Sequence, residues 1–290
     1  SPVGDLPAPL VERFEITYLP SASALGRLDN EGPSSDWLFA GFGDPEPIAA
    51  RSRDGQRLAH LVDGFDLPAL PASRRELATI HRLLGGDGEV RLGGEATEAA
   101  LRFAADRGAR ILHLATHTVV DERPGQGAAI LLTAADDDDG LLRPAEIAEL
   151  ELRTDLTVLA ACRSALGGSE NGRAFASLTG SLLAAGSSAV VASLWNVDDE
   201  ASAAFMEQFY YQISRGETPA AALRKAKLRL RADPTWDRPE LWGAFILIGE
   251  APRLLPAWRI PPGSWLAAVL ILGFGVARWR HNRSRDSLPT

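Results

Sequence analysis

The chain has a single cysteine in 290 residues, so no disulfide can form within it. It lacks a CxxC pair and an HExxH sequence, which argues against the common kinds of zinc site. Lys and Arg number only 30 against 38 Asp and Glu, and the formal net charge of −8 argues against a general nucleic-acid-binding surface. A GxSxG sequence is also missing, so serine chemistry has little support.

Apolar residues make up 46% of the chain, enough for a sizeable core in one large domain or two small ones. Continuous apolar strands alternate with helices along the sequence. This alternation predicts an α/β fold with a mainly parallel sheet covered on both faces. We expect strands at 14–19, 36–45, 88–92, 109–117, 128–133, 155–162, 188–195 and 242–249. We expect helices at 73–84, 95–108, 143–152, 198–214 and 218–233, and a glycine-rich loop and a helix between 162 and 188.

The only cysteine and one histidine stand at comparable places, because Cys162 ends the run TVLAAC and His117 ends the run ILHLATH. Parallel sheets bind ligands at the C-terminal ends of their strands. An imidazole near a thiol can take its proton and later pass it to a leaving amine. The two residues are therefore a candidate nucleophile and base, provided that their strands are neighbours. The alternative, that both are inert parts of the structure, stays open. His113 is expected to face the core.

The acidic run Asp136–Asp139 raises the question of a calcium site. Its spacing is not that of an EF-hand loop, and Gly140 follows directly. We interpret it as a solvated loop and expect no metal site.

In the C-terminal region, no residue from Ile260 to Ala277 is charged. A membrane span needs about 20 apolar residues, and this run lies at the short end of that range. Tryptophans flank it and four arginines follow it, as at a membrane interface. We predict a single transmembrane helix at 263–279, with the side of the membrane open. The alternative is a helix that packs on the domain or on a partner.

Several segments resemble the CHAT domain, a family of caspase-like cysteine peptidases related to separase. The segments are ILHLATH, TVLAAC, ALGGSENG, LLAAGSSAVVASLWNVDD, FYYQISRGETPAAALRKAK and WGAFILIGE, with weaker matches at YLPSASAL and GFGDP. They cover the chain from Phe14 to Glu250 in the family's order. The resemblance implies a caspase–haemoglobinase-like three-layer sandwich with a mainly parallel central sheet. It also implies hydrolysis of peptide bonds by a Cys–His dyad.

By this resemblance Cys162 is the nucleophile and His117 the general acid/base, and no metal or organic cofactor is needed. The backbone N–H groups of Thr118 and Cys162 would form the oxyanion hole, although Thr118 stands where the family commonly has glycine. Asp199, with Asp198 beside it, matches the acid that binds a basic P1 side chain in separase-like enzymes. The alternative is that these two acids only begin the following helix.

The predicted organisation has five parts. They are a linker or truncated N-terminal part at 1–13, a CHAT peptidase domain at 14–250, a linker at 251–262, the transmembrane helix at 263–279 and a basic tail at 280–290. The predicted function is a membrane-tethered cysteine endopeptidase that cleaves a specific protein after a basic residue. The resemblance adds regulated proteolysis or bacterial defence as settings and an upstream sensor or repeat module as a partner. The rival prediction is a non-catalytic interaction scaffold at a membrane.

Overall fold

The computed structural model describes residues 8–20, 37–46, 70–121, 127–135, 138–160 and 170–256. Three features predicted from the sequence lie outside these residues. They are the candidate nucleophile Cys162, the transmembrane segment at 263–279 and the basic tail at 280–290. The structure describes His117 and the strand that leads towards Cys162.

The main sheet of the described region has six strands in the order β2-β1-β3-β7-β8-β9. Neighbouring strands are parallel, except that β9 runs antiparallel to β8. This arrangement confirms the predicted mainly parallel sheet. The bounds are β1 Phe39–Gly43, β2 Gly88–Leu92, β3 Ile111–Ala115, β7 Leu156–Leu159, β8 Ala189–Ser193 and β9 Phe245–Gly249.

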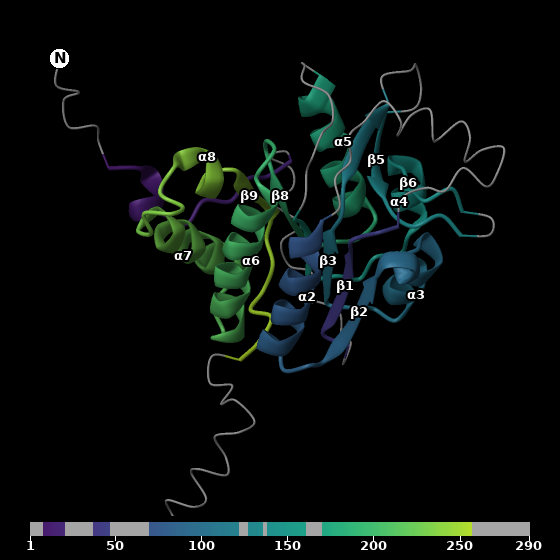
Figure 1. Ribbon diagram of the computed structural model, residues 1–290, viewed down its shortest axis with the longest axis horizontal. Helices are drawn as coiled ribbons and strands as arrows, with labels where there is room; N and C mark the ends of the chain where they lie inside the picture. Colours follow the sequence, from purple (N-terminus) through teal and green to yellow (C-terminus); the bar gives the residue numbers. More distant parts are fainter. Residues whose placement is uncertain are drawn as a thin grey trace, which may run out of the picture.

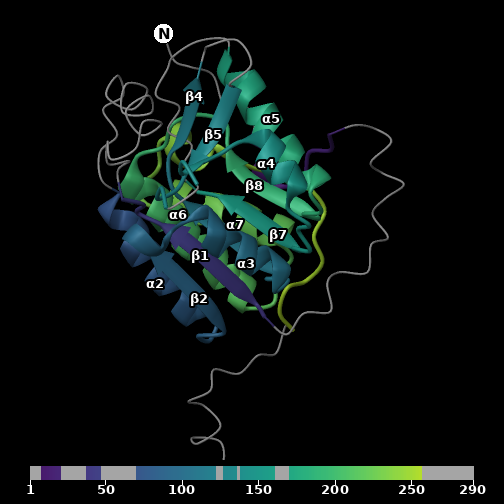
Figure 2. The same ribbon diagram turned by 90° about the vertical axis from the view of Figure 1, so that its right-hand side faces the viewer.

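Helices cover both faces of this sheet (Figures 1 and 2). One face carries α2 Pro71–Leu83, α6 Asp199–Ser214, α7 Pro219–Arg231 and α8 Pro239–Trp242. The other carries α3 Glu98–Asp106, α4 Pro144–Glu149 and α5 Glu170–Ala184. Alternate strand residues enter the two cores, as the pleat requires: Ile111 packs on the α6 side and Leu112 on the α5 side.

Two short 3-10 helices lie at the margins, η1 Leu10–Glu12 and η3 Gly93–Glu95. The N-terminal segment was predicted to form a strand at 14–19, and this prediction is wrong. A single bridge joins Tyr18 to Ile248 of β9, and Phe14, Ile16 and Tyr18 are exposed. The apolar side chains of this segment therefore do not pack on a core. An alternating apolar pattern indicates a strand only where one face of that strand is buried.

Two predicted boundaries also differ from the structure. Helix α2 begins at Pro71 rather than at Ser73, because proline is well suited to the first helical position. The Ser73 hydroxyl instead donates to the Leu70 carbonyl at 2.7 Å. The last strand begins at Phe245 rather than Trp242, because residues 239–242 form α8.

A second, antiparallel sheet of three strands follows His117. Its strands are β4 Thr118–Asp121, β5 Gly127–Leu131 and β6 Leu141–Leu142, in the order β4-β5-β6. The sequence indicates only β5, because β4 and β6 are too short to show a pattern of their own. Residues Ile130 and Leu142 of this sheet share the α5-side core, so the small sheet is fixed to the main domain.

Within the described ranges, no helix is both long and apolar enough to span a bilayer. The segment at 263–279 is not among those residues, so the transmembrane helix stays a prediction.

A buried polar network joins the main sheet to the two helices α2 and α6. The His113 ring on β3 contacts the Glu76 carboxylate of α2 at 2.7 Å and the Tyr210 hydroxyl of α6 at 2.9 Å. All three side chains are buried, so both ring nitrogens are satisfied without water. The prediction that His113 faces the core is confirmed. The network holds α2 and α6 over the strand that leads to His117.

The substitution Tyr210→Phe should lower the free energy of unfolding by about 1–3 kcal/mol, because it leaves a buried ring nitrogen of His113 without its partner. The control is Tyr211→Phe, which alters an exposed hydroxyl one residue away and should change stability by less than about 0.5 kcal/mol. Urea denaturation of the three proteins measures both effects. Equal stability of the Tyr210 variant and wild type would contradict the assigned network.

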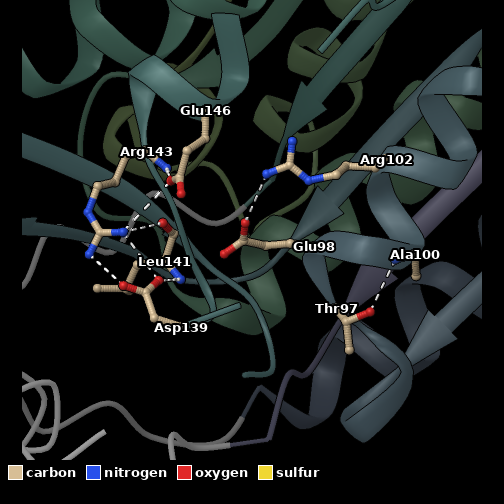
Figure 3. A network of polar contacts seen from close by, with 8 residues as sticks. All are labelled: Thr97, Glu98, Ala100, Arg102, Asp139, Leu141, Arg143 and Glu146. Carbon is tan, nitrogen blue, oxygen red and sulfur yellow. Dashed lines mark hydrogen bonds and ion pairs between the residues drawn. The ribbon is translucent and has the colours of Figure 1, made fainter. Parts of the chain in front are cut away.

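A second polar network lies where α3 meets β6 and α4 (Figure 3). The Glu98 carboxylate is 1% exposed and lies 3.5 Å from the Arg102 guanidinium, while Arg143 bonds Asp139 at 2.9 Å. Burial raises the pKa of Glu98 to about 7, and the negative charges of Glu146, Asp138 and Asp139 add to this effect. Arg102 opposes it. Glu98 therefore takes up a proton near neutral pH.

The folded-state pKa of Glu98 lies above the ordinary value of 4.5, so folding favours the protonated carboxyl. This contribution to stability is fully present below pH 4.5 and is lost as the pH rises through about 7. Glu98→Gln mimics the protonated acid, so it should raise the melting temperature at pH 8 and have little effect at pH 5. Thermal unfolding across this range tests the prediction, with the exposed Glu149→Gln as control. A gain that does not vary with pH would refute it.

Candidate active site

The strands that precede the two candidate catalytic residues are direct neighbours. β3 pairs with β7 in parallel, and Leu114 lies opposite Leu159. The Ala160 N–H continues the ladder by donating to the Leu114 carbonyl at 3.0 Å. His117 is three residues beyond Leu114, and Cys162 is three residues beyond Leu159. The condition set by the sequence, that the two strands be adjacent with their ends at one edge, is therefore met.

Two sheets hold the backbone of His117. The residue follows β3 and precedes β4, and its carbonyl accepts a hydrogen bond of 2.8 Å from the Leu131 N–H at the end of β5. Its side chain is only 4% exposed. The imidazole is thus carried on a segment anchored at both ends, as a catalytic base requires.

The hydrogen-bond pattern of the small sheet bears on Thr118, the predicted oxyanion donor. Because Leu131 donates to His117, these two residues form a hydrogen-bonded pair of the antiparallel ladder. The next pair, Thr118 with Ile130, is then of the non-hydrogen-bonded type, with its N–H groups directed away from the partner strand. The Thr118 N–H therefore points away from β5, to the side of β4 on which no described strand pairs.

Helix α6 fixes the end of β7. The Ser202 hydroxyl, buried in the first turns of α6, donates to the Ala160 carbonyl at 2.8 Å. Ala160 is two residues before Cys162 and is the last residue described on this strand. This hydrogen bond ties the exit of the strand to the helix that begins with the two candidate substrate-binding acids.

Those acids have different surroundings. Asp198 is exposed and is the N-cap of α6, accepting hydrogen bonds from the N–H groups of Glu200 at 3.1 Å and Ala201 at 3.3 Å. Asp199 is half-buried, and its carboxylate accepts a hydrogen bond of 3.1 Å from the Ala72 N–H in the first turn of α2. The carboxylate of Asp199 thus lies where the N-termini of α2 and α6 meet.

Burial raises the pKa of Asp199, and the nearby charges of Glu76, Glu200 and Asp198 act in the same direction. The hydrogen bond from Ala72 lowers it. Asp199 forms no salt bridge with a described residue, whereas the neighbouring Glu200 pairs with Arg75. A cationic group arriving at Asp199 would therefore meet an uncompensated, partly desolvated carboxylate, and burial makes such a pairing stronger than one at an open surface.

In the described part of the chain, no group of three or more His, Cys, Asp and Glu side chains is arranged to hold a metal ion. Asp139 is bonded to Arg143, and residues 136 and 137 lie outside the described ranges.

These features define an α/β domain with a mainly parallel sheet and a candidate site at the C-terminal ends of its central strands. The family model for the CHAT domain matches residues 3–250, and the chain belongs to the CHAT domain family.

Two curated relatives are both tetratricopeptide repeat protein 28. The mouse (Mus musculus) protein is 33% identical over 118 residues, or 39% of this chain and 5% of that protein. The human (Homo sapiens) protein is 26% identical over 290 residues, or 84% of this chain and 11% of that protein. The chain therefore corresponds to a small part of these relatives.

Among solved structures, the chain is similar to the Arg-specific cysteine proteinase gingipain R, with a TM-score of 0.49 and 10% identity. The alignment covers 80% of this chain and 52% of that one. A complex of the pro- and mature domains of the Porphyromonas gingivalis protein RgpB aligns with a TM-score of 0.47, at the same identity and coverage.

The structure thus brings His117, Thr118 and the exit of β7 to one edge, and it places Asp199 on the helix anchored to that exit. It also adds Ser202 and the Ala72 N–H, which the sequence did not indicate. Ser202 has no distinguishing local pattern, and a backbone N–H has none at all. Their roles follow only from contacts between α6, α2 and β7.

The cap on α6 yields a prediction about Asp198. Asp198→Ala should lower the free energy of unfolding by about 0.5–2 kcal/mol, because the first turn of α6 loses its side-chain acceptor. Asp198→Asn keeps an acceptor oxygen and should lose much less. Urea denaturation compares the two variants, and equal losses would show that the negative charge matters and the cap does not.

Proposed function

We propose that this CHAT domain is a cysteine endopeptidase in which Cys162 is the nucleophile and His117 the general acid/base, with a preference for Arg or Lys at P1. The observation that carries the proposal is the parallel pairing of β3 with β7. It joins β3, which leads to His117, with β7, which leads towards Cys162, and Leu114 near the end of β3 lies opposite Leu159 at the end of β7. Membership of the CHAT domain family supports the same assignment.

The chemistry follows the order of proton transfers. His117 takes the proton of the Cys162 thiol, since the thiolate is the nucleophilic form. The sulfur attacks the scissile carbonyl carbon, and the resulting oxyanion accepts hydrogen bonds from the N–H groups of Thr118 and Cys162. The imidazolium then gives its proton to the leaving amine. Water, deprotonated by His117, hydrolyses the acyl-enzyme and restores the thiol.

The preference for a basic P1 residue is supported by charge. Asp199 has no resident salt-bridge partner among the described residues, while other acids at this edge have one: Asp44 pairs with Arg74 and Glu200 with Arg75. A P1 guanidinium or ammonium group supplies the missing cation and forms charge-assisted hydrogen bonds.

We further propose that the domain is tethered by the segment at 263–279 to a membrane and acts on a specific protein substrate. The two relatives are tetratricopeptide repeat proteins, and this supports a repeat module as a regulatory partner. From the family resemblance, we propose that the domain acts in regulated proteolysis, including bacterial defence.

The test is cleavage of a mixed peptide library by the whole chain in detergent. Wild type should cut after Arg or Lys, and Cys162→Ala should abolish cleavage. His117→Ala should lower kcat/KM by at least about 100-fold, the lower end of the contribution of a general base. Asp199→Asn should raise KM for basic P1 residues more than it lowers kcat, because it removes a binding charge.

Cleavage that persists in Cys162→Ala would refute the dyad. If wild type leaves the library and added repeat-containing partner proteins uncut, the non-catalytic scaffold is the better assignment. A third outcome, cuts after residues other than Arg and Lys, would retain the peptidase and reject the role of Asp199 in P1 recognition.

A further inference from the structure

Ser193, the last residue of β8, has a buried hydroxyl group that forms no hydrogen bond with any described residue. The residue is 2% exposed. Three other buried serines do have partners: Ser73 donates to the Leu70 carbonyl, Ser202 to the Ala160 carbonyl, and Ser187 donates to the Ala189 carbonyl and accepts from the Thr157 hydroxyl. A buried hydroxyl without a partner destabilises the folded protein, so its presence calls for a role outside folding.

The register of the sheet locates Ser193 beside the exit of β7, the strand that leads towards Cys162. Leu159 of β7 lies opposite Ala192 of β8, so Ser193 lies beside Ala160, with strand axes about 4.8 Å apart. Ala160 is two residues before Cys162. Ser193 is two residues after Val191, so the two side chains lie on the same face of the sheet. The Val191 side chain packs in the α6-side core, and Ser193 therefore faces that side.

Helix α6 brings Asp199 to the same place. Ser202 bonds the Ala160 carbonyl at 2.8 Å, and Asp199 lies three residues earlier, on the same face of the helix and about one turn away. Ala160 at the end of β7 thus has Ser193 beside it on the neighbouring strand, and its carbonyl is bonded to α6, the helix that carries Asp199 in its first turn. Both are acceptors: among the described residues, the Ser193 hydroxyl has no hydrogen-bond partner and the Asp199 carboxylate has no salt bridge.

We propose that Ser193 is a specificity-determining residue that accepts a hydrogen bond from the basic P1 side chain while Asp199 balances its charge. This inference rests on the proposed function. A guanidinium group presents five N–H donors in a planar fork and can reach two separate acceptors at once. The three donors of an ammonium group diverge from one compact centre. The pair of acceptors therefore favours Arg over Lys at P1.

The deciding variant is Ser193→Ala, assayed for cleavage of matched peptides with Arg or Lys at P1. The value of kcat/KM for the Arg peptide should fall by about 10- to 100-fold, mainly through KM, the range for loss of a hydrogen bond to a charged group. The preference for Arg over Lys should shrink. The melting temperature of the free protein should rise, because an unpartnered buried hydroxyl has been removed.

The matched control is Ser187→Ala, which removes an equally buried hydroxyl that has two hydrogen bonds at the opposite end of β8. It should lower the melting temperature and leave the preference for Arg unchanged. If the role of Ser193 were purely structural, the preference for Arg over Lys would be unchanged in both variants.

A binding assay separates failure of this inference from failure of the proposed peptidase. Agmatine carries a guanidinium group and cannot be cleaved, so its stabilisation of the fold is measured by thermal shift in wild type and in Ser193→Ala. Arg cleavage unaffected by Ser193→Ala would overturn the inference and leave the peptidase standing. If wild type cleaves nothing, a shift with agmatine that Ser193→Ala loses supports the recognition site alone, and no shift overturns both.

Discussion

The parallel pairing of β3 with β7 is the interaction on which the candidate site depends. Residues on neighbouring parallel strands advance together, so two side chains that follow their strands by the same number of residues reach the same edge. Leu114 lies opposite Leu159, and along the chain His117 is three residues beyond the first and Cys162 three residues beyond the second. A shift of either strand by one residue would turn its exit to the other face of the sheet. The core residues on both faces prevent such a shift.

Helix α6 connects the two central strands, β3 and β7, with helix α2. α6 is joined to β7 through Ser202, to α2 through Asp199 and to β3 through Tyr210. The small sheet holds the far side of His117 through Leu131. A substrate bound at Asp199 would therefore contact a helix that is hydrogen-bonded, through buried side chains, to β3 and to the end of β7.

Several polar groups in this domain are buried in surroundings that lower the stability of the folded state. Burial, with neighbouring acids adding to it, raises the pKa of Glu98 to about 7, and the buried hydroxyl of Ser193 has no hydrogen-bond partner among the described residues. The Asp199 carboxylate accepts a hydrogen bond from the first turn of α2, and it forms no salt bridge with a described residue. Its structural and functional interpretations are compatible, because one carboxylate has lone pairs for both the Ala72 N–H and an incoming cation.

The sequence by itself determined the α/β class, most of the main-sheet strands and the two strands that precede His117 and Cys162 in the chain. These features depend on local patterns: continuous apolar runs, helical spacing and turn residues. It could not reveal β4 and β6, which are stable only as partners of β5, nor the exposure of Phe14 and Ile16. Only the tertiary structure decided that Ser202 anchors β7, that Asp199 joins two helix N-termini and that Ser193 is buried without a partner. Such contacts join residues that are far apart in the chain. The local sequence around a serine or an aspartate is the same whether or not the folded protein gives its side chain a hydrogen-bond partner.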